Sequence, residues 1–175
     1  MRKKNLLAVT LMVLCVGLMA CGGKEKEAET QAQTQQEQQK AETGYVFENK
    51  GLTMNIDGNV TDYVAKLGEP SGGYYEAKSC AFEGLDKFWY YDGFTLQGYQ
   101  KSGAELVYAI TFDDDTVKTK EGVKIGDSKE KMTSAYGSNY KQDGNMYSYV
   151  SGNMELQFTV KDEVVMGITY ALKAE

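Results

Sequence analysis

The chain of 175 residues contains no histidine. Without histidine there is no Ser-His-Asp triad and no Cys-His pair, and the commonest metal ligand in proteins is missing. Zinc sites take four ligands from cysteine, histidine and carboxylate groups, and this chain lacks a usual set. Its 19 glycines form no G-x-x-x-x-G-K-[ST] phosphate loop. We therefore expect no catalytic residue, no bound metal and no cofactor.

Cysteine is scarce, with three residues in the chain. Cys15 and Cys21 belong to an N-terminal segment described below, so Cys80 is the one cysteine of the folded part. That part can form no internal disulfide, and its thiol has no histidine partner to activate it. Because free cysteines are most often small buried hydrophobes, we predict that Cys80 is buried.

Basic residues are fewer than acidic ones. Of the 19 basic residues three lie in residues 1–20, which leaves 16 against 25 acidic residues and a net charge of −9 beyond residue 20. Such an excess of negative charge repels phosphate backbones and anionic headgroups. We therefore expect no nucleic-acid partner, and attachment to a membrane has to come from a lipid rather than from a basic patch.

Long hydrophobic runs are absent except at the N-terminus, where residues 6–20 are apolar apart from Thr10 and follow a basic start. This pattern is typical of a secretory signal. The run is shorter than the ~20 residues that a helix needs to cross a bilayer. Its ending, Leu-Met-Ala followed by Cys21, resembles the lipobox of bacterial lipoproteins. The resemblance implies cleavage before Cys21, a lipid such as palmitate on it, and a position on the extracytoplasmic side of the cell membrane.

Residues 21–44 contain the lipid-bearing Cys21 followed by a Gln-, Glu-, Lys- and Ala-rich stretch that has no large apolar residue. Such a stretch cannot bury enough surface to offset the entropy of ordering, so we predict a disordered linker. All 13 tyrosines, all six phenylalanines and the single tryptophan follow it. The predicted organisation is a signal peptide over 1–20, the lipidated cysteine and linker over 21–44, and one domain over 45–175.

Two short helices are predicted from apolar spacing. The first follows residues 54–59 and has one apolar face, formed by Val60, Tyr63, Val64 and Leu67. Gly68 and the single proline, Pro70, then end it. The second carries Met132, Ala135 and Tyr136 and ends at Gly137. Either Asp127 or Ser128 is its predicted N-cap.

Strict alternation of apolar and polar residues predicts strands after each helix. After the second helix, Met154 to Val160 alternates, and Met166, Ile168, Tyr170 and Leu172 form the predicted inward set of the next strand. A strand over 147–150 precedes them. After the first helix, the stretches 88–91, 94–97 and 108–112 follow the same order. Each helix is therefore expected to lead into a three-strand antiparallel meander.

The predicted fold is α+β, with two tandem units at 54–112 and 123–172 and both helices on one face of the sheet. The sequence Ile-Gly-Asp-Ser-Lys-Glu at 125–130, followed by a helix, a glycine and aromatic strands, resembles the tandem units of the BamE/β-lactamase-inhibitor-protein-like (BLIP-like) superfamily. This superfamily occurs in many small bacterial lipoproteins. None of its binding residues matches a position of this chain.

Asp113, Asp114 and Asp115 form the densest charge cluster. Three carboxylates suit Ca²⁺, but the D-x-[DN]-x-[DN]-G spacing of a calcium loop is missing. We therefore predict a solvated turn after the strand that ends at Phe112.

Aromatic residues provide the candidate binding surface. By analogy with Tyr147 and Tyr149, alternation places Phe88 and Tyr90 toward the core. The opposite face then carries the candidate binding residues, which are Trp89, Tyr91, Tyr99 and Val107. Tyrosine and tryptophan dominate binding hot spots, so one hypothesis is an exposed interaction surface. The alternative is that residues 74–82 or the other unit cover this face.

These features favour a non-enzymatic, membrane-anchored binding module whose partner is an unidentified protein or envelope component. A structural accessory lipoprotein of an envelope complex is one alternative. A hydrolase of the envelope that uses carboxylates is another, although no spacing singles out two of the 25 acidic residues.

Overall fold

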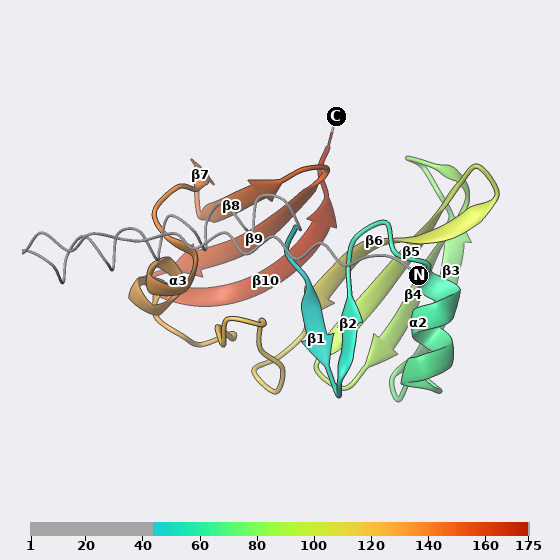
Figure 1. The fold of residues 1–175 in the computed structure, drawn as a ribbon, viewed down its shortest axis with the longest axis horizontal. Helices are drawn as coiled ribbons and strands as arrows, with labels where there is room; N and C mark the ends of the chain where they lie inside the picture. Colours follow the sequence, from blue (N-terminus) through green and yellow to red (C-terminus); the bar gives the residue numbers. More distant parts are fainter. Residues whose placement is uncertain (1–43, 175) are drawn as a thin grey trace, which may run out of the picture.

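An eight-stranded antiparallel sheet dominates the computed structural model, which describes residues 44–174 (Figure 1). The predicted signal peptide, the lipidated Cys21 and almost all of the linker lie outside the described residues. The strand order is β3-β4-β5-β6-β10-β9-β8-β7. The strands are β3 (Gly73–Lys78), β4 (Glu83–Tyr91), β5 (Phe94–Lys101), β6 (Ala104–Phe112), β7 (Lys141–Asp143), β8 (Met146–Ser151), β9 (Met154–Lys161) and β10 (Val164–Leu172). Between residues 44 and 174 no helix is long and apolar enough to span a membrane.

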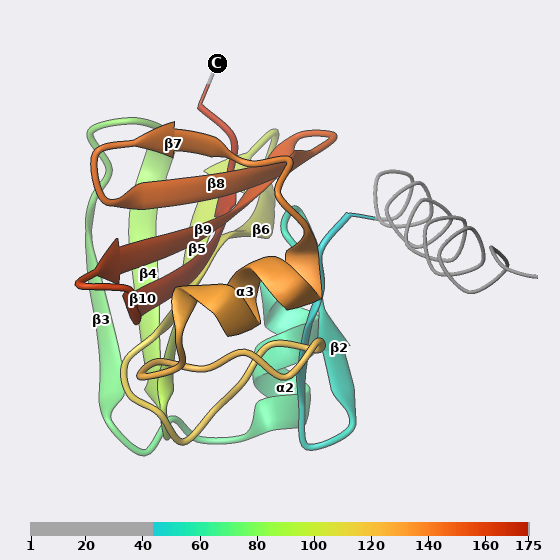
Figure 2. The same ribbon diagram turned by 90° about the vertical axis from the view of Figure 1, so that its left-hand side faces the viewer.

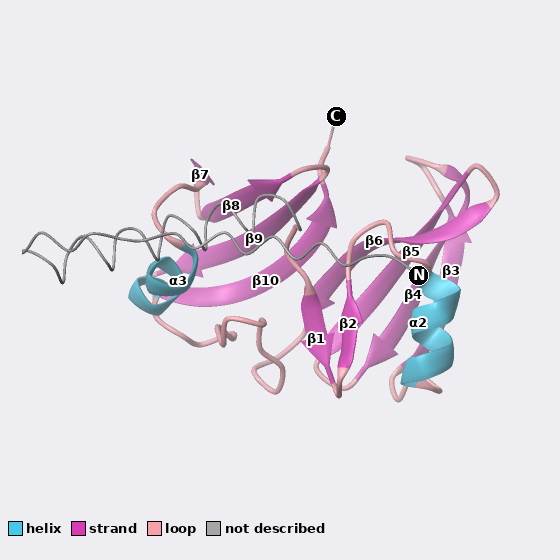
Figure 3. Ribbon diagram, viewed as in Figure 1, coloured by secondary structure: helices cyan, strands magenta, loops and turns pink. Residues whose placement is uncertain are grey.

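The predicted α+β fold of two helix-plus-three-strand units is wrong. The described residues are mostly β, as the colouring of Figure 3 makes plain, and the two helices have eight residues each. Each helix is followed by four strands, and β6 pairs with β10 to make one continuous sheet. β3 was missed because its sequence, GYYEAK, shows no apolar-polar alternation on this sheet edge. β7 was missed because it has only three residues, all exposed.

Both helices form where the apolar spacing predicted them. α2 (Val60–Leu67) begins after Asn59, whose side chain accepts a hydrogen bond from a backbone amide of the first turn, and ends at Gly68 with a φ of 79°. α3 (Lys129–Tyr136) is capped by Ser128 and ends at Gly137. Of the two predicted caps, Ser128 therefore has this role. The Asp127 carboxylate instead accepts hydrogen bonds from the Lys124 amide and the Lys131 ammonium group.

The alternation predicted for β9 is confirmed, because Leu156 and Phe158 are buried and Thr159 is exposed. In β10 the inward set begins one residue earlier than predicted. Val165 is buried and Met166 is exposed, since the register shifts between Val165 and Gly167. Such a bulge inserts one extra residue and reverses the alternation beyond it.

A small hairpin of β1 (Phe47–Asn49) and β2 (Leu52–Met54) lies on the sheet face that also carries the helices (Figures 1 and 2). Phe47 is fully buried, with its ring 5.0 Å from those of Phe94 and Phe112 and 6.1 Å from that of Tyr170. Phe94 and Phe112 belong to the first four strands, whereas Tyr170 belongs to the last four. The hairpin thus packs on the line where the two halves of the sheet meet.

Candidate functional site

Two of the candidate binding residues lie on the face opposite to the predicted one. In the β4–β5 register Trp89 is opposite Leu96 and Tyr91 is opposite Phe94, and both partners are buried in the core. Trp89 and Tyr91 therefore face the helices and pack partly buried against the core. The analogy between Phe88 and Tyr147 was off by one residue, and a slip of one residue moves every side chain of a strand to the other face.

Tyr99 and Val107 are not exposed either, since their exposed fractions are 2% and 0%. The register shift between Gln97 and Gly98 leaves Tyr108 as an extra residue on β6, so Val107 turns toward the core. Tyr99 is buried differently, because the Phe82 ring packs against it. The four residues therefore do not form the shared open surface that alternation predicted. Trp89, Tyr91 and Tyr99 instead line three separate depressions, and Val107 belongs to the core.

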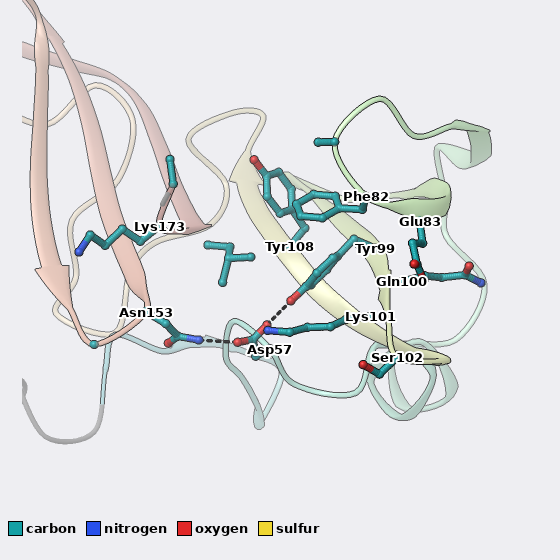
Figure 4. A pocket seen from close by; sticks show the side chains of 14 residues that line it. Asp57, Phe82, Glu83, Tyr99, Gln100, Lys101, Ser102, Tyr108, Asn153 and Lys173 are labelled. Carbon is teal, nitrogen blue, oxygen red and sulfur yellow. Dashed lines mark hydrogen bonds between the residues drawn. The ribbon is translucent and has the colours of Figure 1, made fainter.

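The depression that contains Tyr99, hereafter the central groove, has a volume of about 870 Å³. It opens where the pairing of β6 with β10 ends. Residues 109–111 of β6 pair with β10, whereas Leu106 of β6 forms an isolated bridge with Asn59. Its lining comes from both halves of the sheet (Figure 4). The lining residues are Asp57, Ala81, Phe82, Glu83, Tyr99, Gln100, Lys101, Ser102, Tyr108, Gly152, Asn153, Leu172, Lys173 and Ala174.

Three aromatic rings form one wall of the central groove (Figure 4). The ring of Phe82 lies 4.5 Å from that of Tyr99 and 5.2 Å from that of Tyr108. Phe82 is in the loop between β3 and β4, where the Ser79 hydroxyl accepts hydrogen bonds from the amides of Ala81 and Phe82. This local turn holds the Phe82 ring against the two tyrosines, so the wall is preformed.

Asp57 joins the two halves of the sheet at the groove. Its carboxylate accepts a hydrogen bond of 2.6 Å from the Tyr99 hydroxyl on β5 and another from the side-chain amide of Asn153 in the β8–β9 turn (Figure 4). Asp57 has a φ of 62°, a left-handed conformation that aspartate tolerates better than most residues. Hydrogen bonds between residues 57–58 and the Val107 backbone hold this turn on β6.

Burial, and then the hydrogen bond to Asp57, raise the pKa of Tyr99 above its ordinary value. The phenol therefore stays protonated and continues to donate to the carboxylate at neutral pH. The other charged residues of the lining are Glu83, Lys101 and Lys173. The site thus combines aromatic faces with amide, carboxylate and ammonium groups, which is a composition suited to binding.

Cys80 is exposed, so the prediction that it is buried is wrong. It lies in the same β3–β4 loop as Phe82, where the short turn leaves its side chain outside the core. The three consecutive aspartates each contact a neighbour instead of one another: Asp113 accepts from Thr95, Asp114 from Thr116, and Asp115 pairs with Lys124. Over residues 44–174 no group of three or more potential metal ligands is present.

Sequence reasoning missed most of the groove. Asp57 and Asn153 are 96 positions apart, and neither their spacing nor their residue types mark them as partners. Phe82 belongs to a segment that was considered only as a cover for the sheet. The one available signal was the concentration of tyrosines after residue 44, which identified Tyr99 but not its surroundings.

Comparisons with known proteins give little further information. No protein-family profile matches the chain, and no curated protein matches it. A crystal structure of an extracellular protein containing an SCP domain from Bacillus anthracis str. Ames is similar at 17% sequence identity and a TM-score of 0.42. The similarity covers 74% of this chain and 49% of that one, so this chain spans about half of that protein's length. A similarity this low carries no argument about function, and the resemblance to the BamE/BLIP-like superfamily stays a prediction.

Proposed function

We propose that this chain is a lipid-anchored, extracytoplasmic binding module that holds a protein or envelope component in the central groove without chemical conversion. The signal-like N-terminus and the Leu-Met-Ala-Cys21 sequence support the anchor. The groove supports the binding role, since its aromatic wall and its polar side chains come from segments far apart in the sequence and are held together by the Asp57 hydrogen bonds.

The observation that carries the proposal is the preformed aromatic wall of Phe82, Tyr99 and Tyr108 beside polar groups of the other half of the sheet. Rigid aromatic side chains give large contact areas at low entropic cost, and a few fixed polar groups then orient the ligand. The volume of about 870 Å³ is within the range of ligand-binding clefts, roughly 300–1,000 Å³. A groove of this size accommodates a segment of a partner chain or a short stretch of a polymer.

A binding role is favoured over carboxylate-based hydrolysis. Glycoside hydrolases of the common type need two carboxyl groups that face the scissile bond. Asp57 and Glu83 are the two carboxylates of the lining, and both oxygens of Asp57 already accept hydrogen bonds from the protein. Glu83 therefore has no second free carboxylate in the central groove with which to form a catalytic pair.

Site-specific photocrosslinking in intact cells tests the proposal. A photoreactive residue in place of Lys101, which lines the groove, should give a discrete adduct. The same residue in place of Lys141, exposed on β7, should not. Replacing Phe82 and Tyr108 by leucine preserves apolar bulk but removes two rings of the wall, so the Lys101 adduct should be lost. Equal adducts from both positions, or an adduct that survives the double replacement, would contradict a binding role of this groove.

A further inference from the structure

A second groove, hereafter the α2 groove, is lined by residues of α2, of the turn after it and of strands β3 and β4. These elements lie at one edge of the sheet (Figure 1). It has a volume of about 760 Å³ and shares no lining residue with the central groove. Its lining residues are Val64, Ala65, Gly68, Glu69, Pro70, Gly73, Tyr74 and Trp89. The apolar side chains come from α2 and from the turn after it, and the two aromatic rings come from the strands.

Trp89 and Tyr74 form an aromatic pair in the α2 groove. They are opposite each other in the β3–β4 register, with ring centroids 5.3 Å apart and ring planes inclined at 43°. The indole lies over Gly98, where a Cβ atom would come within 3.0 Å of the ring. Tyr74 is 47% exposed, an unusual position for a large aromatic side chain. Both rings thus line an accessible groove.

The charge of the α2 groove is negative. Glu69 is the only charged residue of its lining. Beside the groove, Glu76 accepts a hydrogen bond of 2.5 Å from the Tyr74 hydroxyl. Partial burial, this hydrogen bond and the charges of Glu76 and Glu105 raise the pKa of Tyr74 to about 12. Lys87, which is opposite Glu76 in the register, is in an ion pair with Glu105.

We propose that the α2 groove binds a quaternary ammonium group of a small molecule. A cation over the face of tryptophan or tyrosine is attracted by the ring quadrupole, most strongly by tryptophan. The acidic side chains add a long-range attraction for the same charge. A primary ammonium group has three N–H donors that need acceptors, whereas the lining has one acidic side chain, Glu69, among aromatic rings and aliphatic carbon. A quaternary group has no N–H donor and therefore fits this lining better. This inference concerns a site separate from the proposed role of the central groove.

Trp89 makes the proposal directly measurable, because it is the only tryptophan of the chain. Titrating the full-length protein with choline should give a saturable change of its fluorescence. The neutral isostere 3,3-dimethylbutan-1-ol, which carries a carbon in place of the nitrogen, should give no saturable change at the same concentrations. Added NaCl should weaken choline binding, since it screens the acidic side chains. Equal responses to choline and the alcohol, or no saturable response to choline, would overturn the proposal.

Two adjacent tyrosines provide a matched pair of variants. Tyr74→Leu removes one ring from the groove, whereas Tyr75→Leu removes a ring that is 55% exposed on the opposite face of the same strand. Tyr74→Leu should weaken choline binding about three- to thirty-fold, the range expected for one cation–π contact. Tyr75→Leu should leave it unchanged. Equal choline affinities of the two variants would contradict the assigned site.

Glu69→Gln gives an independent test that leaves both rings in place. Glu69 is exposed, so the replacement does not disturb the core. It should weaken choline binding and reduce its dependence on NaCl. Glu130→Gln, an exposed replacement in the first turn of α3, is the control and should change neither. An unchanged salt dependence in Glu69→Gln would count against an electrostatic contribution of the groove and so against the proposal.

Discussion

At the scale of single residues, the aliphatic side chains of β9 and β10 are expected to dominate stability. Leu156 and Ile168 have exposed fractions of 0% and 1%. Leu156→Ala and Ile168→Ala should therefore each lower the free energy of unfolding by ~2–5 kcal/mol, whereas Thr159→Ala on the exposed side should change it by less than ~0.5 kcal/mol. Urea denaturation of the three variants measures these differences. Similar losses for all three would show that the strand faces are assigned wrongly.

Buried tyrosines make stability depend on alkaline pH. Burial is the largest cause that raises the pKa of Tyr99 and Tyr136, followed for Tyr99 by its bond to Asp57 and for Tyr136 by the nearby Tyr170 and Glu121. In each case the folded-state pKa exceeds the unfolded-state pKa near 10. The contribution of the two protonated phenols to stability is therefore complete below about pH 10, and it is lost as the pH rises toward the folded-state pKa. We expect the free energy of unfolding to fall above about pH 10.

The variant Tyr99→Phe separates this effect from general alkaline damage. It removes one titrating group together with its hydrogen bond to a carboxylate, so it should cost about 1.5–3 kcal/mol at neutral pH. Its free energy of unfolding should then decline less steeply above about pH 10 than that of the unaltered protein. Denaturant unfolding over a series of pH values measures both effects, and parallel curves would mean that Tyr99 does not contribute to the alkaline loss.

At the scale of elements, helix α3 is expected to depend on its cap. The Ser128 side chain accepts a hydrogen bond of 3.2 Å from the amide of Lys131. Ser128→Ala should lower the free energy of unfolding by about 0.5–2 kcal/mol, because the amide loses its acceptor at the end of the helix. Ser138→Ala, an exposed replacement just beyond the other end of α3, serves as the control in the same thermal melts. A cap variant as stable as the control would refute this role of Ser128.

The elements that were predicted correctly are those whose information is local. The apolar face from Val60 to Leu67 and the glycine after it are enough to define α2. β9 was equally predictable because one face of the strand is buried and the other is at least partly exposed to solvent. β3 was not predictable in this way, since it lies at the edge of the sheet and its residues from Gly73 to Glu76 are all exposed. Its pairing with β4 is a property of the tertiary structure.

The candidate site was harder to predict than the fold because its geometry depends on register. The aromatic run from Phe88 to Tyr91 in β4 occupies both phases of the alternation, so period-two reasoning had no marker to show that Trp89 lies opposite Leu96. The bulge at Tyr108 on β6 then changes the face of Val107. Tyr99 was selected for its residue type, yet its role as a donor to Asp57 required knowledge of a turn 42 positions away.

At the scale of the whole molecule, three sets of contacts among residues 44–174 join the two halves of the sheet. β6 pairs with β10, the Phe47 ring contacts rings of both halves, and the Asp57 carboxylate receives donors from both. The central groove lies beside the last of these connections. A binding surface therefore forms only when the chain has folded as one unit, which explains why no short motif marks it in the sequence.

The proposed membrane location is inferred from the first 21 residues, and one substitution tests it. A lipobox cysteine carries its acyl chains on the thiol and on the amino group exposed by cleavage, and two or more chains hold a protein firmly on a bilayer. Residues 21–175 carry a net charge of −9, so electrostatic attraction to anionic lipids offers no substitute anchor. Cys21→Ser should therefore move the protein from the membrane fraction to the soluble fraction after a high-salt wash, as measured by immunoblotting. The central-groove variant Phe82→Leu is the control and should stay with the membrane. A Cys21→Ser protein that still pellets with membranes after the wash would mean that the chain is held there by something other than a lipid on this cysteine.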